Sequence, residues 1–342
     1  MMSTGRELRP TGWLRAVLSD PARARYLPTM HPHELRFLER VLDPVVDEVQ
    51  AVQRRFTVLP MDPLVPVSLI VCIGNQDQSP AAIALQSAMA LWTIALDDLL
   101  DSGDLSEADA AAVLRQCRLA ASASSPRPST DLGAAMAWFQ SALARYPLWN
   151  ELRPSWHRSL QAFLGSAGVE FRMSRALAAF SGEPTALKRY VFHGSRSIGL
   201  PWLLITGLAL RRDESAVGVL PHLVALADKC GTAVRLANDL AGAHREADEG
   251  TINAVAVLAE ELKAQGLSAT EAFEIGSRRV ESMLERALRQ VHKLVMQAKT
   301  DSGVESQFAR FTEFSVEFQR KGDIRHLAVE PLAAVFSEQT VA

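Results

Sequence analysis

The chain has 342 residues, of which 48% are hydrophobic and 6% aromatic, and its formal net charge is -3. This length and apolar content allow one large hydrophobic core. The absence of a basic excess and the low aromatic content argue against a nucleic-acid partner. The cysteines Cys72, Cys117 and Cys230 lie far apart, which is typical of a reducing compartment and excludes a CxxC zinc site.

The N-terminal segment lacks the continuous apolar core of a signal peptide. The longest apolar runs, such as LPWLLITGLAL, are shorter than a bilayer span. We therefore expect a cytoplasmic protein without a membrane partner. Residues 1–30 contain three prolines, and we expect them to form a loose N-terminal arm.

The helical period of 3.6 residues dominates the rest of the chain. Residues 31–56 read as a helix with one proline interruption, and LVPVSLIVCI at 64–73 is the one β-branched run that could be extended. Residues 79–101 form the strongest predicted helix, with Ser79 as N-cap and Pro80 at the first helical position. Further helices are expected at 106–122, 132–146, 150–180, 184–210, 215–247, 252–265, 268–298 and 302–320.

A first acidic cluster, Asp97, Asp98 and Asp101, ends the most apolar of these helices. Asp97 and Asp101 are four positions apart and share a helix face, whereas Asp98 points about 100° around the axis. Carboxylates at a helix C-terminus oppose the negative end of the helix dipole. Taken alone, the cluster is equally well explained as a solvated helix end.

A second cluster lies in NDLAGAHRE, where Asn238, Gly242 and Glu246 are spaced by four and four. The three positions line one helix face across roughly 12 Å. Amide and carboxylate oxygens are hard ligands that suit Mg²⁺. A glycine inside a helix costs about 1 kcal/mol relative to alanine, which is tolerable where water or a ligand approaches the backbone. The alternative is a polar helix end with an incidental glycine.

Both clusters follow long apolar helices, and we expect these two helices to pack side by side with their polar ends facing across a cavity. Two acidic rims repel each other unless cations bridge them. Mg²⁺ binds through one or two carboxylates together with substrate phosphates. The predicted ligand therefore has a polyphosphate head and an apolar tail.

The two motifs together resemble those of class I terpene synthases. DDLLD at 97–101 is similar to their aspartate-rich DDxxD motif. NDLAGAHRE at 238–246 is similar to their second metal motif, with Gly242 where the family usually has Ser or Thr. The likeness covers roughly residues 60–325, and the ordered pair is far more specific than either motif alone. It implies a single-domain, all-α class I terpenoid synthase bundle over residues 31–325, followed by a C-terminal tail at 326–342.

The resemblance also implies roles for the motif residues. Asp97 and Asp101 would bind Mg²⁺ on one wall of the site, and Asn238 and Glu246 would bind it on the other. Three Mg²⁺ ions are expected, with Mn²⁺ as the alternative ion. Gly242 would contribute to the metal site only by leaving space for a water molecule.

Diphosphate-binding cations are expected close to these motifs. Arg245 directly precedes Glu246 and fits the family pattern. It is also a candidate ion-pair partner for Asp98, which is not expected to bind the metal directly. We favour Arg196 as the diphosphate-sensing arginine, although neither it nor Arg189 stands at the usual position. Arg320 takes the place of the arginine in the C-terminal Arg-Tyr pair of many bacterial sesquiterpene synthases, but Lys321 replaces the tyrosine.

An apolar cavity would protect the carbocation that remains once the diphosphate leaves. Aromatic faces stabilise cations at close range, and Trp92, Phe171 and Trp202 are candidate cavity residues. For each of them, packing in the ordinary core is the main alternative. Gly199, in RSIGLPWLL, marks the expected helix break at the cavity.

This RSIGLPWLL segment is more similar to bacterial diterpene synthases of the kaurene-synthase type. The low aromatic content also suits a partly cyclised substrate. We therefore expect geranylgeranyl diphosphate or a copalyl-type bicyclic diphosphate, and farnesyl diphosphate is the alternative. No DxDD motif is present, so a bicyclic substrate would have to come from a separate class II diterpene cyclase. A homodimer is among the expected assemblies, because helical enzymes of this kind are often dimers.

Three other classes of protein compete with this interpretation. A chain-elongating prenyltransferase would carry two DDxxD motifs, and a head-to-head condensing enzyme of the squalene or phytoene type would carry two DxxxD-like motifs. A non-catalytic helical scaffold would require both acidic clusters to be solvated helix ends. Metal-dependent release of diphosphate separates the terpene synthase from the scaffold.

Overall fold

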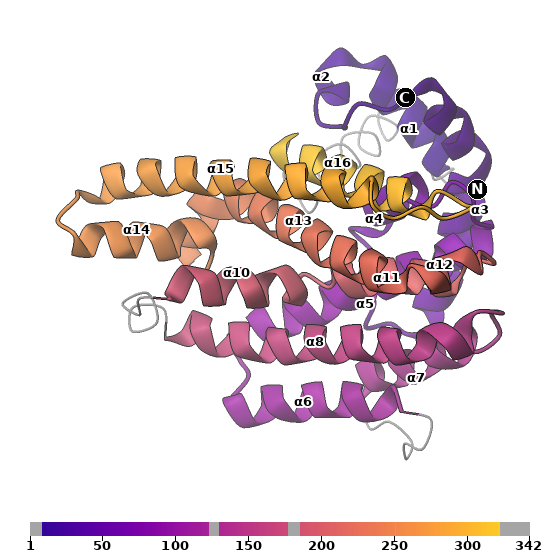
Figure 1. The fold of residues 1–342 in the computed structure, drawn as a ribbon, viewed down its shortest axis with the longest axis horizontal. Coiled ribbons are helices and arrows are strands. Elements are labelled where there is room, and N and C mark those ends of the chain that lie inside the picture. Colours follow the sequence, from indigo (N-terminus) through magenta and orange to yellow (C-terminus); the bar gives the residue numbers. More distant parts are fainter. Residues whose placement is uncertain (1–8, 123–129, 177–184, 250, 322–342) are drawn as a thin grey trace, which may run out of the picture.

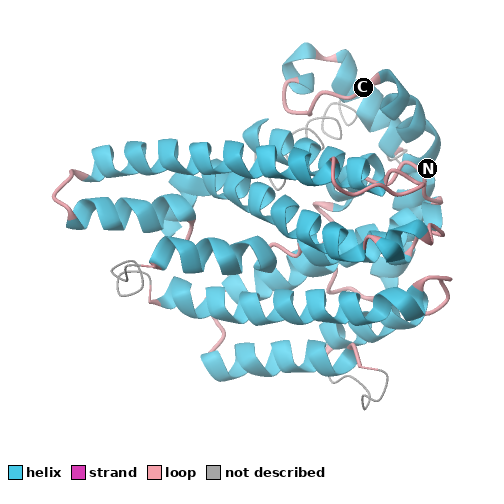
Figure 2. Ribbon diagram, viewed as in Figure 1, coloured by secondary structure: helices cyan, strands magenta, loops and turns pink. Residues whose placement is uncertain are grey.

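The computed structural model describes residues 9–122, 130–176, 185–249 and 251–321. All regular secondary structure within these residues is helical, as Figure 2 shows. The helices in chain order are α1 (Pro10–Ser19), α2 (Pro21–Ala24), α3 (Pro32–Arg55), α4 (Leu64–Ile73), α5 (Pro80–Asp101), α6 (Glu107–Ala120), α7 (Asp131–Leu143), α8 (Trp149–Arg175), α10 (Ala186–Ser197), α11 (Leu200–Ala209), α12 (Ser215–Gly218), α13 (Leu220–Glu249), α14 (Ala254–Ala264), α15 (Ala269–Val295) and α16 (Val304–Lys321).

The long helices are stacked in layers (Figure 1). α6 packs on α8, α8 packs on α10 and α11, and these two helices pack on α13, which in turn contacts α15 and α16. α5 lies inside the bundle and contacts α3, α4, α7 and α11. By length and composition it is the one helix among the described residues that could cross a membrane, but 78% of its most apolar window is buried inside the bundle. Its apolar sequence is therefore explained by its place in the core.

Local sequence signals explain where two functionally important helices begin. The hydroxyl of Ser79 accepts a hydrogen bond from the backbone N–H of Ala82 at 3.3 Å, and Pro80 takes the first helical position of α5, as predicted. The break between α10 and α11 is at Gly199, whose φ of 74° lies in the left-handed region that favours glycine. The helical region predicted over 184–210 is therefore two helices, with the break at Gly199 where it was expected, and the chain changes direction there.

The structure corrects two further expectations. The β-branched run 64–73 is helix α4, which is buried among α3, α5 and α16, and the described residues contain no strand with which it could pair. The part of the predicted loose arm that the structure describes is also folded: α1 packs on α3 and buries Leu14 and Val17. Residues 1–8 and the predicted tail at 326–342 lie outside the described residues.

Candidate active site

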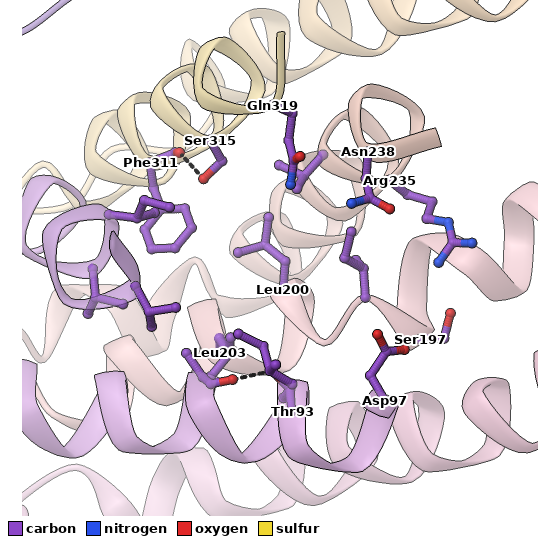
Figure 3. Close-up of a pocket in the computed structure, with 17 residues that line it drawn as sticks. Thr93, Asp97, Ser197, Leu200, Leu203, Arg235, Asn238, Phe311, Ser315 and Gln319 are labelled. Atoms are coloured by element: carbon purple, nitrogen blue, oxygen red, sulfur yellow. Dashed lines mark hydrogen bonds between the residues drawn. The ribbon is translucent and has the colours of Figure 1, made fainter. Parts of the chain in front are cut away.

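Two adjoining cavities of opposite character lie between α5, the α10–α11 break and α13. One has a volume of about 200 Å³ and a mainly apolar lining, and the other has a volume of about 450 Å³ and a mainly polar lining. Asp97, Ser197, Arg235 and Asn238 line both cavities and therefore mark their junction. Figure 3 shows Asp97 and Asn238 on opposite walls of this junction.

The apolar cavity extends from the junction into the bundle. Its wall is largely aliphatic, and Phe311 of α16 is the aromatic residue among those that line it. The ring of Phe311 packs over Gly74, where a β-carbon would lie 2.8 Å from the β-carbon of Phe311. The remaining lining side chains away from the junction are Val67, Ile70, Val71, Ala90, Thr93, Ile94, Ile198, Leu200, Leu203, Val234, Ser315 and Gln319.

The polar cavity brings the two acidic motifs together. Asp97, Asp98 and Asp101 from the end of α5 line one side of it. Asn238, Arg245 and Glu246 from α13 line another side, and Glu170 and Phe171 come from α8. The aspartates are exposed, whereas Glu246 is only 9% exposed. The two motifs thus line one cavity, but the expected side-by-side packing of α5 and α13 is wrong, because the two helices are joined through α11, which contacts both.

Glu246 is held in place by neighbours on both sides. Its carboxylate accepts hydrogen bonds from Asn253 Nδ2 at 3.0 Å and from Arg245 Nη2 at 3.2 Å. The same carboxylate lies over Gly242, where a β-carbon would be 2.6 Å from Cδ of Glu246. Gly242 is therefore required for the observed position of Glu246, and this explains why a glycine occurs within α13.

Arg235 is the cation at the junction of the cavities, and the sequence reading had not singled it out. Its guanidinium forms an ion pair with Glu170 and a second one with Asp239, in which Nε and Oδ1 are 2.8 Å apart. Tyr190 accepts a hydrogen bond from Arg235 and donates one to Asp239 at 2.9 Å. These groups fix the direction of the guanidinium.

Burial sets the protonation behaviour of this network. Desolvation raises the pKa of Asp239 to about 6, although the charge of Arg235 acts in the opposite direction. Burial alone would lower the pKa of Arg235, but the carboxylates of Asp239 and Glu170 outweigh it and raise that pKa well above its ordinary value. Arg235 therefore remains a permanent positive charge beside the aspartates.

Some of the residues predicted for the site lie away from both cavities. Arg196 pairs with Asp228 at 3.3 Å and stacks on Phe192, and the exposed Arg320 pairs with Glu281. Neither arginine is among the lining residues.

The predicted aromatic cavity residues divide in a similar way. Trp92 and Trp202 are fully buried and pack edge to face, with ring centroids 5.8 Å apart, outside the lining of either cavity. Phe171 lines the polar cavity. Gly199 lies between the cavity residues Ile198 and Leu200.

Several residues of the site were missed by sequence reasoning. Arg235 carried a usable signal, because it is a lone cation in the otherwise apolar stretch GTAVRLA that leads into the second motif. Glu170, Ser197 and Gln319 had no such signal, since they are distant in sequence from both motifs and have no distinctive spacing.

Comparisons with known proteins identify the family of the chain. The family model described as "Terpene synthase family 2, C-terminal metal binding" matches residues 88–288, which include both motifs. No curated protein sequence is similar enough to count as a relative.

Solved structures share the fold at low sequence identity. An α-eudesmol synthase has 16% identity and a TM-score of 0.61, and the match covers 85% of this chain and 95% of that one. A linalool/nerolidol synthase from Streptomyces clavuligerus, in complex with 2-fluorogeranyl diphosphate, has 17% identity and a TM-score of 0.60 over 82% and 94% of the two chains. Abietadiene synthase from Abies grandis has 16% identity and a TM-score of 0.62 over 86% of this chain and 40% of that one.

The family match spans more than half of the chain, and the structural matches share its all-helical architecture. The chain therefore belongs to the terpene synthase family, and its fold is that of class I terpene synthases.

Proposed function

We propose that the chain ionises a prenyl diphosphate with Mg²⁺ and guides the resulting carbocation to a cyclised or rearranged product. One observation carries this proposal: Asp97 and Asn238, one from each motif, lie where a polar cavity meets an apolar one. A diphosphate head fits the polar side and an alkyl tail fits the apolar side. The reacting carbon would then lie at the junction.

The residues of the polar cavity fit the expected metal. Asp97, Asp101, Asn238 and Glu246 all supply oxygen atoms, which Mg²⁺ prefers. Among the described residues, no three His, Cys, Asp or Glu side chains are close enough to hold an ion by themselves. Mg²⁺ binds through one or two protein carboxylates and completes its shell with water and phosphate oxygens, so substrate phosphates would supply the remaining ligands. The bound ions, three by analogy with the family, would neutralise the charge of the departing diphosphate.

Arg235 is the proposed diphosphate-binding cation, in the role that the sequence suggested for Arg196. It lines both cavities and is held by Glu170, Tyr190 and Asp239. A charge fixed in advance near the leaving group stabilises negative charge as it develops, without reorganisation during the reaction. Arg245 lines the polar cavity next to Glu246 and supplies a second positive charge.

We infer a C20 substrate, either geranylgeranyl diphosphate or a copalyl-type diphosphate made by a separate class II cyclase. The largely aliphatic lining of the apolar cavity supports this choice, because a substrate that is already partly cyclised depends less on aromatic faces. The modest cavity volume of about 200 Å³ favours the alternative, the shorter farnesyl diphosphate. Both choices share the same chemistry at the diphosphate.

The purified chain should be incubated with Mg²⁺ and separate C10, C15, C20 and copalyl-type diphosphates. Released diphosphate would be quantified, and organic products would be identified by mass spectrometry. We expect metal-dependent release with the C20 substrates, and Mn²⁺ should substitute for Mg²⁺. Turnover of the C15 substrate alone would overturn the C20 assignment, and no release from any substrate would overturn the catalytic function.

A further inference from the structure

Gln319 lines the apolar cavity and has a buried carbonyl oxygen without a partner among the described residues. It lies on α16 and is 6% exposed. Figure 3 shows its amide reaching from α16 toward the cavity. A buried amide without its hydrogen bonds is destabilising, so an orphaned group of this kind calls for a functional or solvent partner.

The hydroxyl groups of Thr93 and Ser315, which line the same cavity, are already engaged. Thr93 donates its hydroxyl hydrogen to the carbonyl of Ala90 at 2.6 Å. Ser315 donates its own to the carbonyl of Phe311 at 2.8 Å. Neither can therefore donate to Gln319, but the oxygen of Ser315 keeps lone pairs that can accept a hydrogen bond.

Gln319 and Ser315 are suited to hold one water molecule between them. They are four positions apart on α16 and both line the apolar cavity, so their β-carbons are about 5–6 Å apart. The terminal amide torsion of glutamine is soft, so its carbonyl oxygen can turn toward the cavity. A cavity of about 200 Å³ has room for water. Two acceptors would bind both hydrogens of this molecule and leave its lone pairs facing the substrate.

We propose that Gln319 holds the water that ends the reaction, so that the product of this enzyme is an alcohol. The inference rests on the function proposed above and specifies its last step. A lone pair of the water oxygen forms a new C–O bond to the carbocation. The oxonium ion then loses a proton to the diphosphate anion that ionisation released, and a neutral alcohol remains. Gln319 touches the nucleophile and is therefore a catalytic residue of this step.

The unmodified enzyme tests the proposal in water enriched in ¹⁸O. With the substrate that it turns over, we expect the main product to be an alcohol that carries one ¹⁸O atom. A product mixture of hydrocarbons alone would overturn the inference while leaving the proposed function intact. Absence of diphosphate release would instead overturn the proposed function, so the two failures are distinguishable.

Substitution of Gln319 by methionine tests the residue itself. Gln319→Met keeps a similar volume and removes the acceptor, and we expect the ratio of alcohol to hydrocarbon to fall about tenfold, the value of one hydrogen bond. Diphosphate release should continue, because ionisation precedes water capture. An unchanged product ratio with a raised KM would mean that the amide binds the diphosphate, and it would overturn the inference.

Gln86 offers a matched control. It is buried, its carbonyl oxygen also has no partner among the described residues, and its amide nitrogen donates to the carbonyl of Leu203 at 2.9 Å. It lines neither cavity. Gln86→Met should therefore leave the product ratio unchanged. An equal fall in both variants would indicate a general effect on the core and would contradict the role of Gln319.

Discussion

The carboxylate of Glu246 lies over Gly242, in the space that any other residue at that position would occupy with its β-carbon. Glu246 reaches this place from one helical turn away and is held there by Asn253 and Arg245. The end of a glutamate side chain is flexible, so a β-carbon would displace it at small cost. Position 242 therefore controls where the carboxylate of the second motif points.

Gly242→Ser and Gly242→Ala displace the carboxylate equally, and only serine adds a hydroxyl oxygen. We expect Gly242→Ser to reach half-maximal diphosphate release at a lower Mg²⁺ concentration than Gly242→Ala, because oxygen ligands suit Mg²⁺. Titration of Mg²⁺ against the initial rate measures this difference. Identical titration curves for the two variants would show that the hydroxyl is not a ligand.

Asp97 lines both cavities and is the strongest candidate for a metal ligand on α5. We expect Asp97→Asn to lower kcat/KM by about 10²–10³-fold, because a charged ligand near the leaving group is lost. The thermal midpoint should change little, since the side chain is exposed. Asp104→Asn, at an exposed position outside both cavities, is the control. Comparable losses in both variants would rule out a specific role for Asp97.

Lysine substitutions at Arg235 and at Arg196 distinguish which of the two arginines binds the diphosphate. Arg235→Lys keeps the charge but loses the planar set of donors that engages Glu170, Tyr190 and Asp239. We expect its kcat to fall about 10²-fold, whereas Arg196→Lys should change kcat by less than about threefold, since Arg196 lies outside both cavities. Steady-state kinetics with circular dichroism melting on both variants makes the comparison. A larger loss in Arg196→Lys would restore the assignment suggested by the sequence.

The pair Glu34–Arg310 joins α3 to α16 and should make stability depend on pH. Burial would raise the pKa of Glu34, but hydrogen bonds from Arg310 and from the backbone of His31 outweigh it, so the pKa lies below its ordinary value of 4.5. The stabilisation is therefore complete above that ordinary value and is lost as the pH falls through the lower folded-state pKa.

Replacing Glu34 by glutamine should lower the free energy of unfolding by about 2 kcal/mol near neutral pH. The difference from the parent should shrink at acidic pH, where the parent also loses the charge. Urea unfolding over a series of pH values measures both effects. Glu39→Gln is the control, because Glu39 lies on α3 like Glu34 and forms a solvent-exposed ion pair with Arg15 of α1. This substitution should change the free energy of unfolding by less than about 0.5 kcal/mol. A pH-independent difference for Glu34→Gln would contradict the ionic origin of the effect.

Periodicity and caps were sufficient to predict most helices, because most of the chain alternates between buried and solvated helix faces. The start of α5 at Ser79 was predicted correctly. Periodicity failed for α4, where burial on all sides removes the helical pattern and leaves a β-branched run that resembles a strand. Periodicity alone ran one helix through 184–210, and the break at Gly199 was expected only from the resemblance of RSIGLPWLL to family members; the left-handed φ of Gly199 confirms it.

The sequence predicted mainly those residues of the site that belong to the two motifs. Asp97 of α5 and Asn238 of α13 lie on opposite walls of one junction (Figure 3). The sequence analysis considered Arg196 and Arg189 and did not consider Arg235, because the direction of each guanidinium depends on which carboxylate it reaches in the folded chain. Trp92 and Trp202 illustrate the same limit, because an aromatic residue in an apolar helix can face either the cavity or the core.

Phe311 lines the apolar cavity, and its ring packs over Gly74. Phe311 therefore forms the cavity wall, whereas Gly74 determines where that wall lies. Gly74 is not among the cavity-lining residues, yet a methyl group added to it would push the ring of Phe311 away from α4. Substitutions at position 74, which does not line the cavity, can therefore change the depth of the cavity that is open to a substrate. A search for the origin of product diversity among similar enzymes would overlook such a position if it considered only the cavity surface.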